Sequence, residues 1–143
     1  MKLIIAGFII LVFCDLMTAQ KILGSKLPKA VTASFIQKFP DVRRESWRKE
    51  GPSEYKAKFI LNDAKTSTNI NEQGEVLKTE TKIKISELPE QVTSGIIVKY
   101  PNAKFVAASK IETLNEGIRY KADIKTGKKN FDVFFSDKGA FIE

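Results

Sequence analysis

Two segments of the chain carry apolar side chains at the spacing of an α-helix. In the first segment, Leu27, Val31 and Phe35 recur every four residues, and the stripe ends at Phe39. Residues 88–100 repeat this pattern. A single apolar stripe of this period is typical of a helix that lies against another layer of the protein. We predict two helices of about 12 residues, each with a proline in its first turn and each ended by a second proline.

Elsewhere the apolar and polar positions alternate with a period of two. Tyr55, Ala57 and Phe59 alternate with lysines, and similar runs follow along the chain. One apolar and one polar face is the pattern of an antiparallel strand that is covered on one side only. Turn signals rich in Gly, Asn and Asp separate the runs. We predict eight strands, at residues 42–49, 54–61, 65–71, 75–85, 103–113, 118–125, 129–136 and 140–143.

The two halves of the chain resemble each other. Residues 25–40 and 86–101 are identical at eight of sixteen aligned positions, including the Leu-Pro pair and the final proline. Further on, Gly74 matches Gly139, and a Tyr-Lys-Ala sequence recurs in the same order in both halves. Chance similarity would not keep this order, so we interpret the chain as two copies of one unit.

The predicted fold class is α+β. Two tandem repeats, residues 25–85 and 86–143, would each contribute one helix followed by four strands. We expect the two sheets to join edge to edge into one long antiparallel sheet, with both helices on one face.

The first 19 residues have the layout of a secretory signal peptide. Lys2 precedes an apolar run of eleven residues, and Ala19 supplies the small residue before the expected cleavage point. A membrane anchor is the weaker interpretation, because a span needs about 20 apolar residues. Lipidation at Cys14 is disfavoured, since Phe13 stands where lipoprotein signals want a small residue. We predict a single domain at residues 20–143, periplasmic or secreted, without stable membrane insertion.

The composition excludes several kinds of chemistry. The chain of 143 residues has no His, and its one Cys lies in the expected signal peptide. The mature chain therefore lacks the residues for His-based nucleophilic catalysis, disulfides and common zinc sites. A carboxylate-based hydrolase is the remaining enzymatic alternative, but the paired carboxylates lie in polar, turn-rich segments where nothing would raise a pKa. We predict that the protein is not an enzyme and needs no cofactor.

A calcium loop is a competing interpretation of the segment from Asn69 to Glu80. Its polar residues match the spacing of an EF-hand loop around Gly74. Calcium prefers carboxylate oxygens, whereas three of these positions are neutral amides. We therefore predict a hairpin turn at Gly74 and no metal site.

Positive charge is concentrated in the first half of the mature chain. The net charge is +6 from residue 20 to 85 and +1 from residue 86 to 143. One interpretation is a solvated sheet face, kept soluble and resistant to edge pairing by its lysines. The other is a binding surface. Alternation places Trp47 on the open polar face, and Trp and Arg are frequent at interface hot spots. The candidate binding residues are Arg43, Trp47, Arg48, Lys49, Lys56, Lys58, Lys82 and Lys84.

Several short motifs together resemble a known family. They are Leu27-Pro28, Phe39-Pro40, Trp47, Tyr55 and residues 74–77 in the first half, with Leu88-Pro89, Tyr100-Pro101, Tyr120 and Gly139 in the second. They resemble the PepSY-like exported bacterial proteins, which are often described as β-lactamase-inhibitor-like. The resemblance covers nearly all of residues 25–143 and departs at Ala108, which stands level with Trp47. It implies two α/β repeats with a curved antiparallel sheet, an exported location and no enzymatic activity.

The expected function is that of an exported binding module. Its open sheet face would hold a protein partner, in the manner of an inhibitor, with Ile60 and Phe134 as apolar anchors on the same polar face. The alternative is an electrostatic binder of anionic envelope polymers, which would use the basic first half. Nucleic acid is a poor candidate for the partner of an exported protein.

Overall fold

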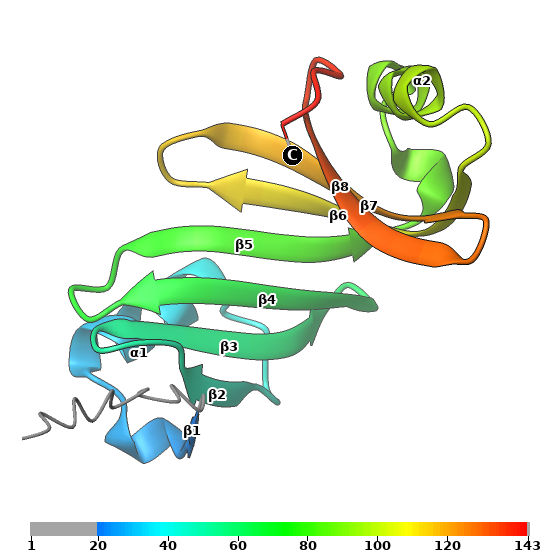
Figure 1. The fold of residues 1–143 in the computed structure, drawn as a ribbon. Coiled ribbons are helices and arrows are strands. Elements are labelled where there is room, and N and C mark those ends of the chain that lie inside the picture. The colour runs from blue at the N-terminus through cyan, green and yellow to red at the C-terminus, as the bar shows by residue number, and fades with distance from the viewer. Residues whose placement is uncertain (1–19, 143) are drawn as a thin grey trace, which may run out of the picture.

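In the computed structural model, which describes residues 20–142, the chain forms one sheet of eight antiparallel strands with two α-helices (Figure 1). The strands lie in the sheet in the order in which they occur along the chain. The expected signal peptide, including Cys14, lies outside the described residues. Among residues 20–142, no helix is both long and apolar enough to cross a membrane.

The elements are β1 (Gln20–Ile22), η1 (Gly24–Lys26), α1 (Lys29–Lys38), β2 (Ser46–Lys49), β3 (Glu54–Leu61), β4 (Ala64–Asn71), β5 (Val76–Ile83), η2 (Ile85–Glu87), α2 (Glu90–Lys99), β6 (Lys104–Thr113), β7 (Gly117–Thr126) and β8 (Lys129–Ser136), where η marks a 3-10 helix.

Both helices are confirmed, and each is ten residues long. They are shorter than predicted because Pro28 and Pro89 are extended N-cap residues, with ψ near 143° and 144°, and do not lie in the first turn. At the other end, Phe39 and Tyr100 leave helical geometry directly before a proline, whose ring disfavours the helical conformation of the residue before it.

Seven of the eight predicted strands are present, with ends that shift by up to four residues. The hairpin at Gly74 is confirmed: the Asn71 side chain accepts hydrogen bonds from the backbone N–H groups of Gln73 (3.1 Å) and Glu75 (2.9 Å). The predicted strand at 140–143 is wrong, because Phe141 makes only an isolated bridge to Phe135. The second half therefore has three strands after its helix, where the first half has four. The sequence pattern did not predict β1.

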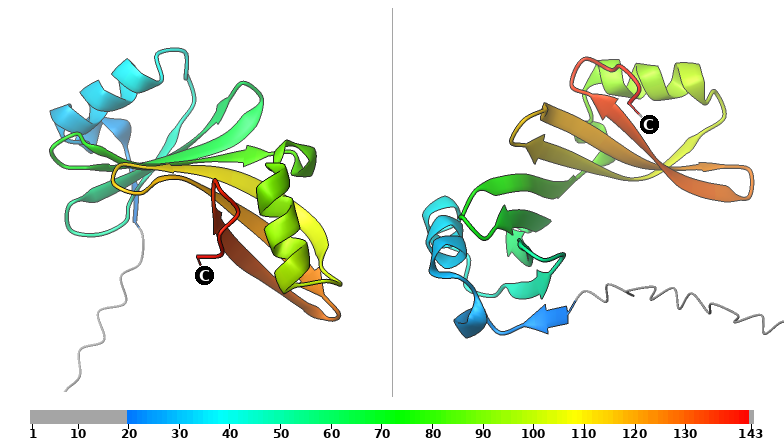
Figure 2. Two further views of the ribbon diagram at one scale, coloured as in Figure 1. Left: turned by 90° about the horizontal axis from the view of Figure 1, so that it is seen from above. Right: turned by 60° about the vertical axis from the view of Figure 1, so that its left-hand side comes forward.

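The two halves of the sheet join between β5 and β6, as expected. Residues paired across strands lie on the same face of a sheet, and so do alternate residues of one strand. Ala57, which lies in the core under α1, pairs with Thr68, and Thr68 pairs with Thr79, so all three lie on one face. Ile83 follows Thr79 by four residues in the same strand and therefore shares this face. Its partner Ala108 lies in the core under α2. Both helices therefore cover one face, as predicted; Figure 2 shows them at the two ends of the twisted sheet.

Each helix packs over its own hydrophobic core. Under α1, the ring of Phe35 lies 5.0 Å from that of Trp47 and 5.2 Å from that of Phe59, measured between centroids. Under α2, Val92 and Ile96 pack with buried residues of β6, β7 and β8. The two clusters share no buried residue. Between them, hydroxyl groups on β4 and β5 hydrogen-bond each other, so the centre of the covered face is polar.

A glycine turn fixes each helix to the sheet. The hydroxyl of Ser34 in α1 donates a hydrogen bond of 2.6 Å to the Gly74 carbonyl. At the other end, Gly139 lies directly against the backbone of Gln91 in α2. Both glycines have positive φ, near 89° and 82°, a conformation that side-chain-bearing residues rarely adopt. A turn without a Cβ thus allows close approach between hairpin and helix.

Candidate binding surface

The sheet face opposite the helices is called the open face here, and the strand register defines its residues. One row of paired residues crosses it from Ser46 through Lys58, Ser67 and Glu80 to Ile111. A neighbouring row runs from Lys82 to Phe134. No helix within residues 20–142 covers these rows, and in Figure 1 α1 lies behind β3 and β4.

The open face holds most of the excess positive charge of the described chain. By register it carries eleven basic side chains and four carboxylates, whereas the rest of residues 20–142 carries twelve basic and eleven acidic residues. Such a face attracts acidic partners and raises their local concentration. Its charged residues are Lys21, Arg48, Lys56, Lys58, Lys65, Lys78, Lys82, Lys104, Arg119, Lys121 and Lys125, with Glu54, Glu80, Asp123 and Asp132.

Half of the predicted binding residues lie on the open face. Arg48, Lys56 and Lys58 are on β2 and β3, and Lys82 is on β5. Lys49 pairs with Tyr55 on the helix-covered side, with its ammonium group 6.0 Å from the centre of the Tyr55 ring. Arg43 and Lys84 are exposed but precede or follow the strands.

The predicted exposure of Trp47 is wrong. Trp47 is 4% exposed and pairs with Ala57, so its side chain lies in the core under α1. Alternation counted back from Trp47 would place Arg43 and Glu45 on the same face, but β2 begins only at Ser46, so strand alternation does not reach them. The indole therefore stabilises the fold and is not available as an interface anchor.

Two apolar residues do lie on the open face, as predicted. Ile60 pairs with Lys65 and is 55% exposed, and Phe134 pairs with Lys121 and is half-buried. The prediction of binding residues missed Lys65, whose strand β4 is rich in Thr and Asn and gave only a weak alternation signal. It also missed Lys121, although the alternation of residues 120–125 placed it on a polar face.

An ion-pair cluster occupies the centre of the open face. The ammonium group of Lys121 on β7 lies 2.7 Å from the carboxylate of Glu80 on β5, and both side chains are about one-fifth exposed. Burial alone would raise the pKa of Glu80, but the hydrogen bond and the charge of Lys121 outweigh it and hold this pKa below its usual value. Burial alone would likewise lower the pKa of Lys121, but Glu80 raises it.

The cluster continues to a pair of carboxylates. Asp123 and Asp132 face each other across β7 and β8, and Lys82 lies 3.9 Å from Asp123. Burial, together with the hydrogen bond and the negative charge of Asp123, raises the pKa of Asp132. Within the described chain, no group of three or more His, Cys, Asp or Glu residues is arranged to hold a metal ion. The carboxylates thus form part of a mixed-charge surface.

The Glu80–Lys121 pair predicts a specific dependence of stability on pH. A carboxylate whose pKa is lowered by folding stabilises the protein above its unfolded-state pKa of about 4.3, and this stabilisation is lost as the pH falls through the folded-state value. We expect Glu80→Gln to lower the free energy of unfolding by about 1 kcal/mol at pH 7, after screening by solvent. At pH 2.5 the two proteins should be equally stable. Urea denaturation at both pH values measures the difference.

Glu116→Gln is the matched control for this experiment. The Glu116 carboxylate pairs with Arg119 at 2.6 Å in the β6–β7 turn but is about half exposed, so we expect a loss below about 0.5 kcal/mol. If the loss of stability caused by Glu80→Gln persisted at pH 2.5, it would contradict the ion-pair explanation.

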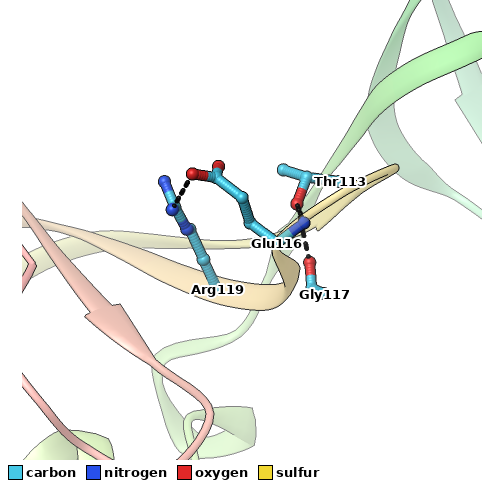
Figure 3. Close-up of polar contacts among 4 residues, drawn as sticks. All are labelled: Thr113, Glu116, Gly117 and Arg119. Atoms are coloured by element: carbon cyan, nitrogen blue, oxygen red, sulfur yellow. Dashed lines mark hydrogen bonds and ion pairs between the residues drawn. The ribbon is translucent and has the colours of Figure 1, made fainter.

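Figure 3 shows the β6–β7 turn that contains Glu116. In this turn the Thr113 hydroxyl accepts a hydrogen bond from the Glu116 N–H and donates one to the Gly117 carbonyl, both at 3.1 Å.

A groove opens on the first half of the open face. It has a volume of about 680 Å³ and lies across β2, β3, β4 and β5. Short side chains from Ser46 and Ser67 line it, together with the longer side chains of Lys58, Lys65 and Lys82. This is called the basic groove below. Its size is within the range of pockets that bind small ligands or a few side chains.

Comparison with known proteins identifies the fold. No protein-family model and no curated protein matches the sequence. The chain is similar to a BLIP-like protein from Bacteroides fragilis NCTC 9343, with a TM-score of 0.70 and 20% identity over 82% of this chain and 84% of that one. It is also similar to a DUF2874 family protein from Bacteroides uniformis ATCC 8492, with a TM-score of 0.73 and 17% identity over 81% and 86%.

A third solved structure, of a candidate periplasmic protein from Bacteroides eggerthii DSM 20697, gives a TM-score of 0.74 and 14% identity over 82% of this chain and 86% of that one. At these identities the similarity is one of fold. The chain therefore has a BLIP-like α+β fold, which agrees with the β-lactamase-inhibitor-like part of the sequence resemblance.

Proposed function

We propose that this protein is a non-enzymatic exported binding module whose open face holds a protein partner. The observation that carries the proposal is the distribution of charge: the open face has eleven basic and four acidic side chains, while the rest of the described chain is nearly balanced. A periplasmic or secreted location is supported by the signal-like residues 1–19 and by the description of the Bacteroides eggerthii protein as a candidate periplasmic one.

A protein partner suits the mixed chemistry of the open face. Ile60 and Phe134 offer apolar contact among the charges, and the Glu80–Lys121 pair fixes a carboxylate in the middle of the face. Protein interfaces combine apolar contact with complementary charges, which set specificity and the rate of association. The BLIP-like neighbour supports inhibitor-like action as one form of this binding.

Binding of anionic envelope polymers is the second candidate function. The excess of basic side chains supports it, because a polyanion needs charge more than shape. Its affinity would fall steeply with salt, since exposed charges are screened beyond about 8 Å at physiological ionic strength.

We also propose that the domain arose from two copies of one unit, the PepSY-like arrangement expected from the sequence, at residues 25–85 and 86–143. Matching features support this origin: the proline N-caps of α1 and α2, and a glycine turn against each helix. The two halves differ in net charge. Under this proposal, only the first copy carries the basic groove.

The proposed function is tested by affinity capture from envelope and secreted extracts with the mature chain, washed at low and then high salt. We expect a protein that is retained at high salt by the wild type but lost with Lys58→Glu/Lys125→Glu, which reverses two open-face charges. The control Lys29→Glu/Lys128→Glu makes the same charge change off the open face and should retain it. If both variants retained the protein equally, the open face would not be its binding surface. Retention of acidic polymer alone, at low salt only, would favour the second function.

A further inference from the structure

The basic groove has a surplus of cations that the described chain does not neutralise. Arg44, Lys58 and Lys65 line it, and within residues 20–142 none has a carboxylate within 4.0 Å. The other two cations of the lining are partly compensated, Lys56 by Glu50 and Lys82 by Asp123, each at 3.9 Å.

The acidic residues of the groove leave this surplus in place. The Glu80 carboxylate is bound to Lys121 at 2.7 Å, so it is not free to pair with the groove's own lysines. Glu45 lies in the loop before β2 and is exposed. Carboxylates from outside the chain would therefore meet three unpaired cations in the basic groove, and hydrogen bonds between such charged groups are stronger than those between neutral ones.

An apolar position lies beside these cations. Ile60 lines the groove, is 55% exposed, and pairs with Lys65 in the register. The short side chains of Ser46 and Ser67 leave the hollow open between the lysines. An apolar side chain of a ligand could thus contact Ile60 while neighbouring carboxylates reach Lys58 and Lys65.

We propose that the basic groove binds an acidic protein segment in which an apolar residue is flanked by carboxylates. This inference rests on the proposed function and names the part of the partner that the open face recognises. A featureless polyanion fits less well, because it gains nothing from Ile60 and would meet the carboxylates of Glu80, Asp123 and Asp132 as it crossed the sheet.

The test uses a labelled, end-capped peptide with Glu-Glu-Leu-Glu-Glu at its centre, binding to the mature chain, measured by fluorescence anisotropy. We expect Lys58→Glu/Lys65→Glu to weaken binding at least about tenfold. The control Lys29→Glu/Lys128→Glu makes the same charge change off the open face and should weaken it less than about threefold. Replacing the peptide's Leu by Ser should weaken binding about fivefold, through lost apolar contact.

Four outcomes would overturn the inference. If a peptide with Gln in place of Glu bound equally well, recognition would not depend on the charge of the peptide. If the two double variants weakened binding equally, the groove would not be the binding site. Tighter binding of polyphosphate that is indifferent to Ile60→Ser would favour a polyanion. If a captured protein partner is held equally by wild type and Lys58→Glu/Lys65→Glu, the groove assignment fails while the open face remains the binding surface.

Discussion

Gly139→Ala should lower the free energy of unfolding by about 2–5 kcal/mol. Gly139 has φ near 82°, and a left-handed conformation costs a side-chain-bearing residue about 1–2 kcal/mol. A Cβ at this position would also overlap the backbone carbonyl oxygen of Gln91 in α2. Because that oxygen belongs to a helix backbone, the overlap can be relieved only by moving α2 and the Gly139 turn apart, which adds about 1–3 kcal/mol. Urea denaturation followed by circular dichroism measures the loss.

Gly127→Ala is the control that separates backbone conformation from close approach. Gly127 has φ near 59°, but nothing lies within 4 Å of the position of its Cβ. We expect this variant to lose only about 1–2 kcal/mol, the conformational part alone. If both variants lost the same amount, the close approach between the Gly139 turn and α2 would impose no steric cost on a side chain at this position.

Phe35→Ala should lower the free energy of unfolding by a similar amount, about 3–5 kcal/mol. This loss would come from the core under α1. Phe35 is 4% exposed, and its ring contacts those of Phe39, Trp47 and Phe59 at centroid distances of 5.0–5.4 Å. Removing it leaves a cavity in the middle of this aromatic cluster. Trp47 is the one tryptophan of the chain, so its fluorescence reports directly on the core under α1.

The neighbouring residue provides the control for this prediction. Ile36 follows Phe35 in α1 but is 59% exposed, so Ile36→Ala should change stability by less than about 0.5 kcal/mol. A similar effect of the two substitutions would contradict the assignment of Phe35 to the centre of the core. If Phe35→Ala lowered the free energy of unfolding but left the unfolding midpoint seen by Trp47 fluorescence unchanged, this would contradict the assignment of Phe35 as well.

Periodicity predicted most of the fold because most elements are long enough to show it. The alternation in residues 54–61 gave the bounds of β3, and the four-residue spacing with its prolines gave both helices. Shorter elements behaved differently. β1 has three residues and β2 four, and so few residues cannot establish an alternation. The side of the sheet on which Trp47 lies was decided by its pairing with Ala57, which is a tertiary contact.

The sequence placed half of the candidate binding residues on the open face, and the structure places the other half elsewhere. Composition located the excess charge in the first half of the mature chain. Which face each charged side chain lies on depends on the strand register. The register places Lys65 and Lys58 in one groove and Lys49 on the covered side. The Glu80–Lys121 pair joins residues that are far apart in sequence and sit two strands apart in the sheet. Contacts of this kind follow from the assembled sheet, and no local pattern contains them.

The order of the strands has a consequence for how this protein folds. Each strand pairs with the next one along the chain, so the sheet grows by adding neighbours and needs no strand inserted between two others. Folding rates rise as the contacts of the native state become more local in sequence, because shorter loops must be closed. A chain that emerges with its N-terminal end first can therefore complete α1 and β2 to β5 while its second half is still unfolded. We expect rapid folding for a sheet of this size.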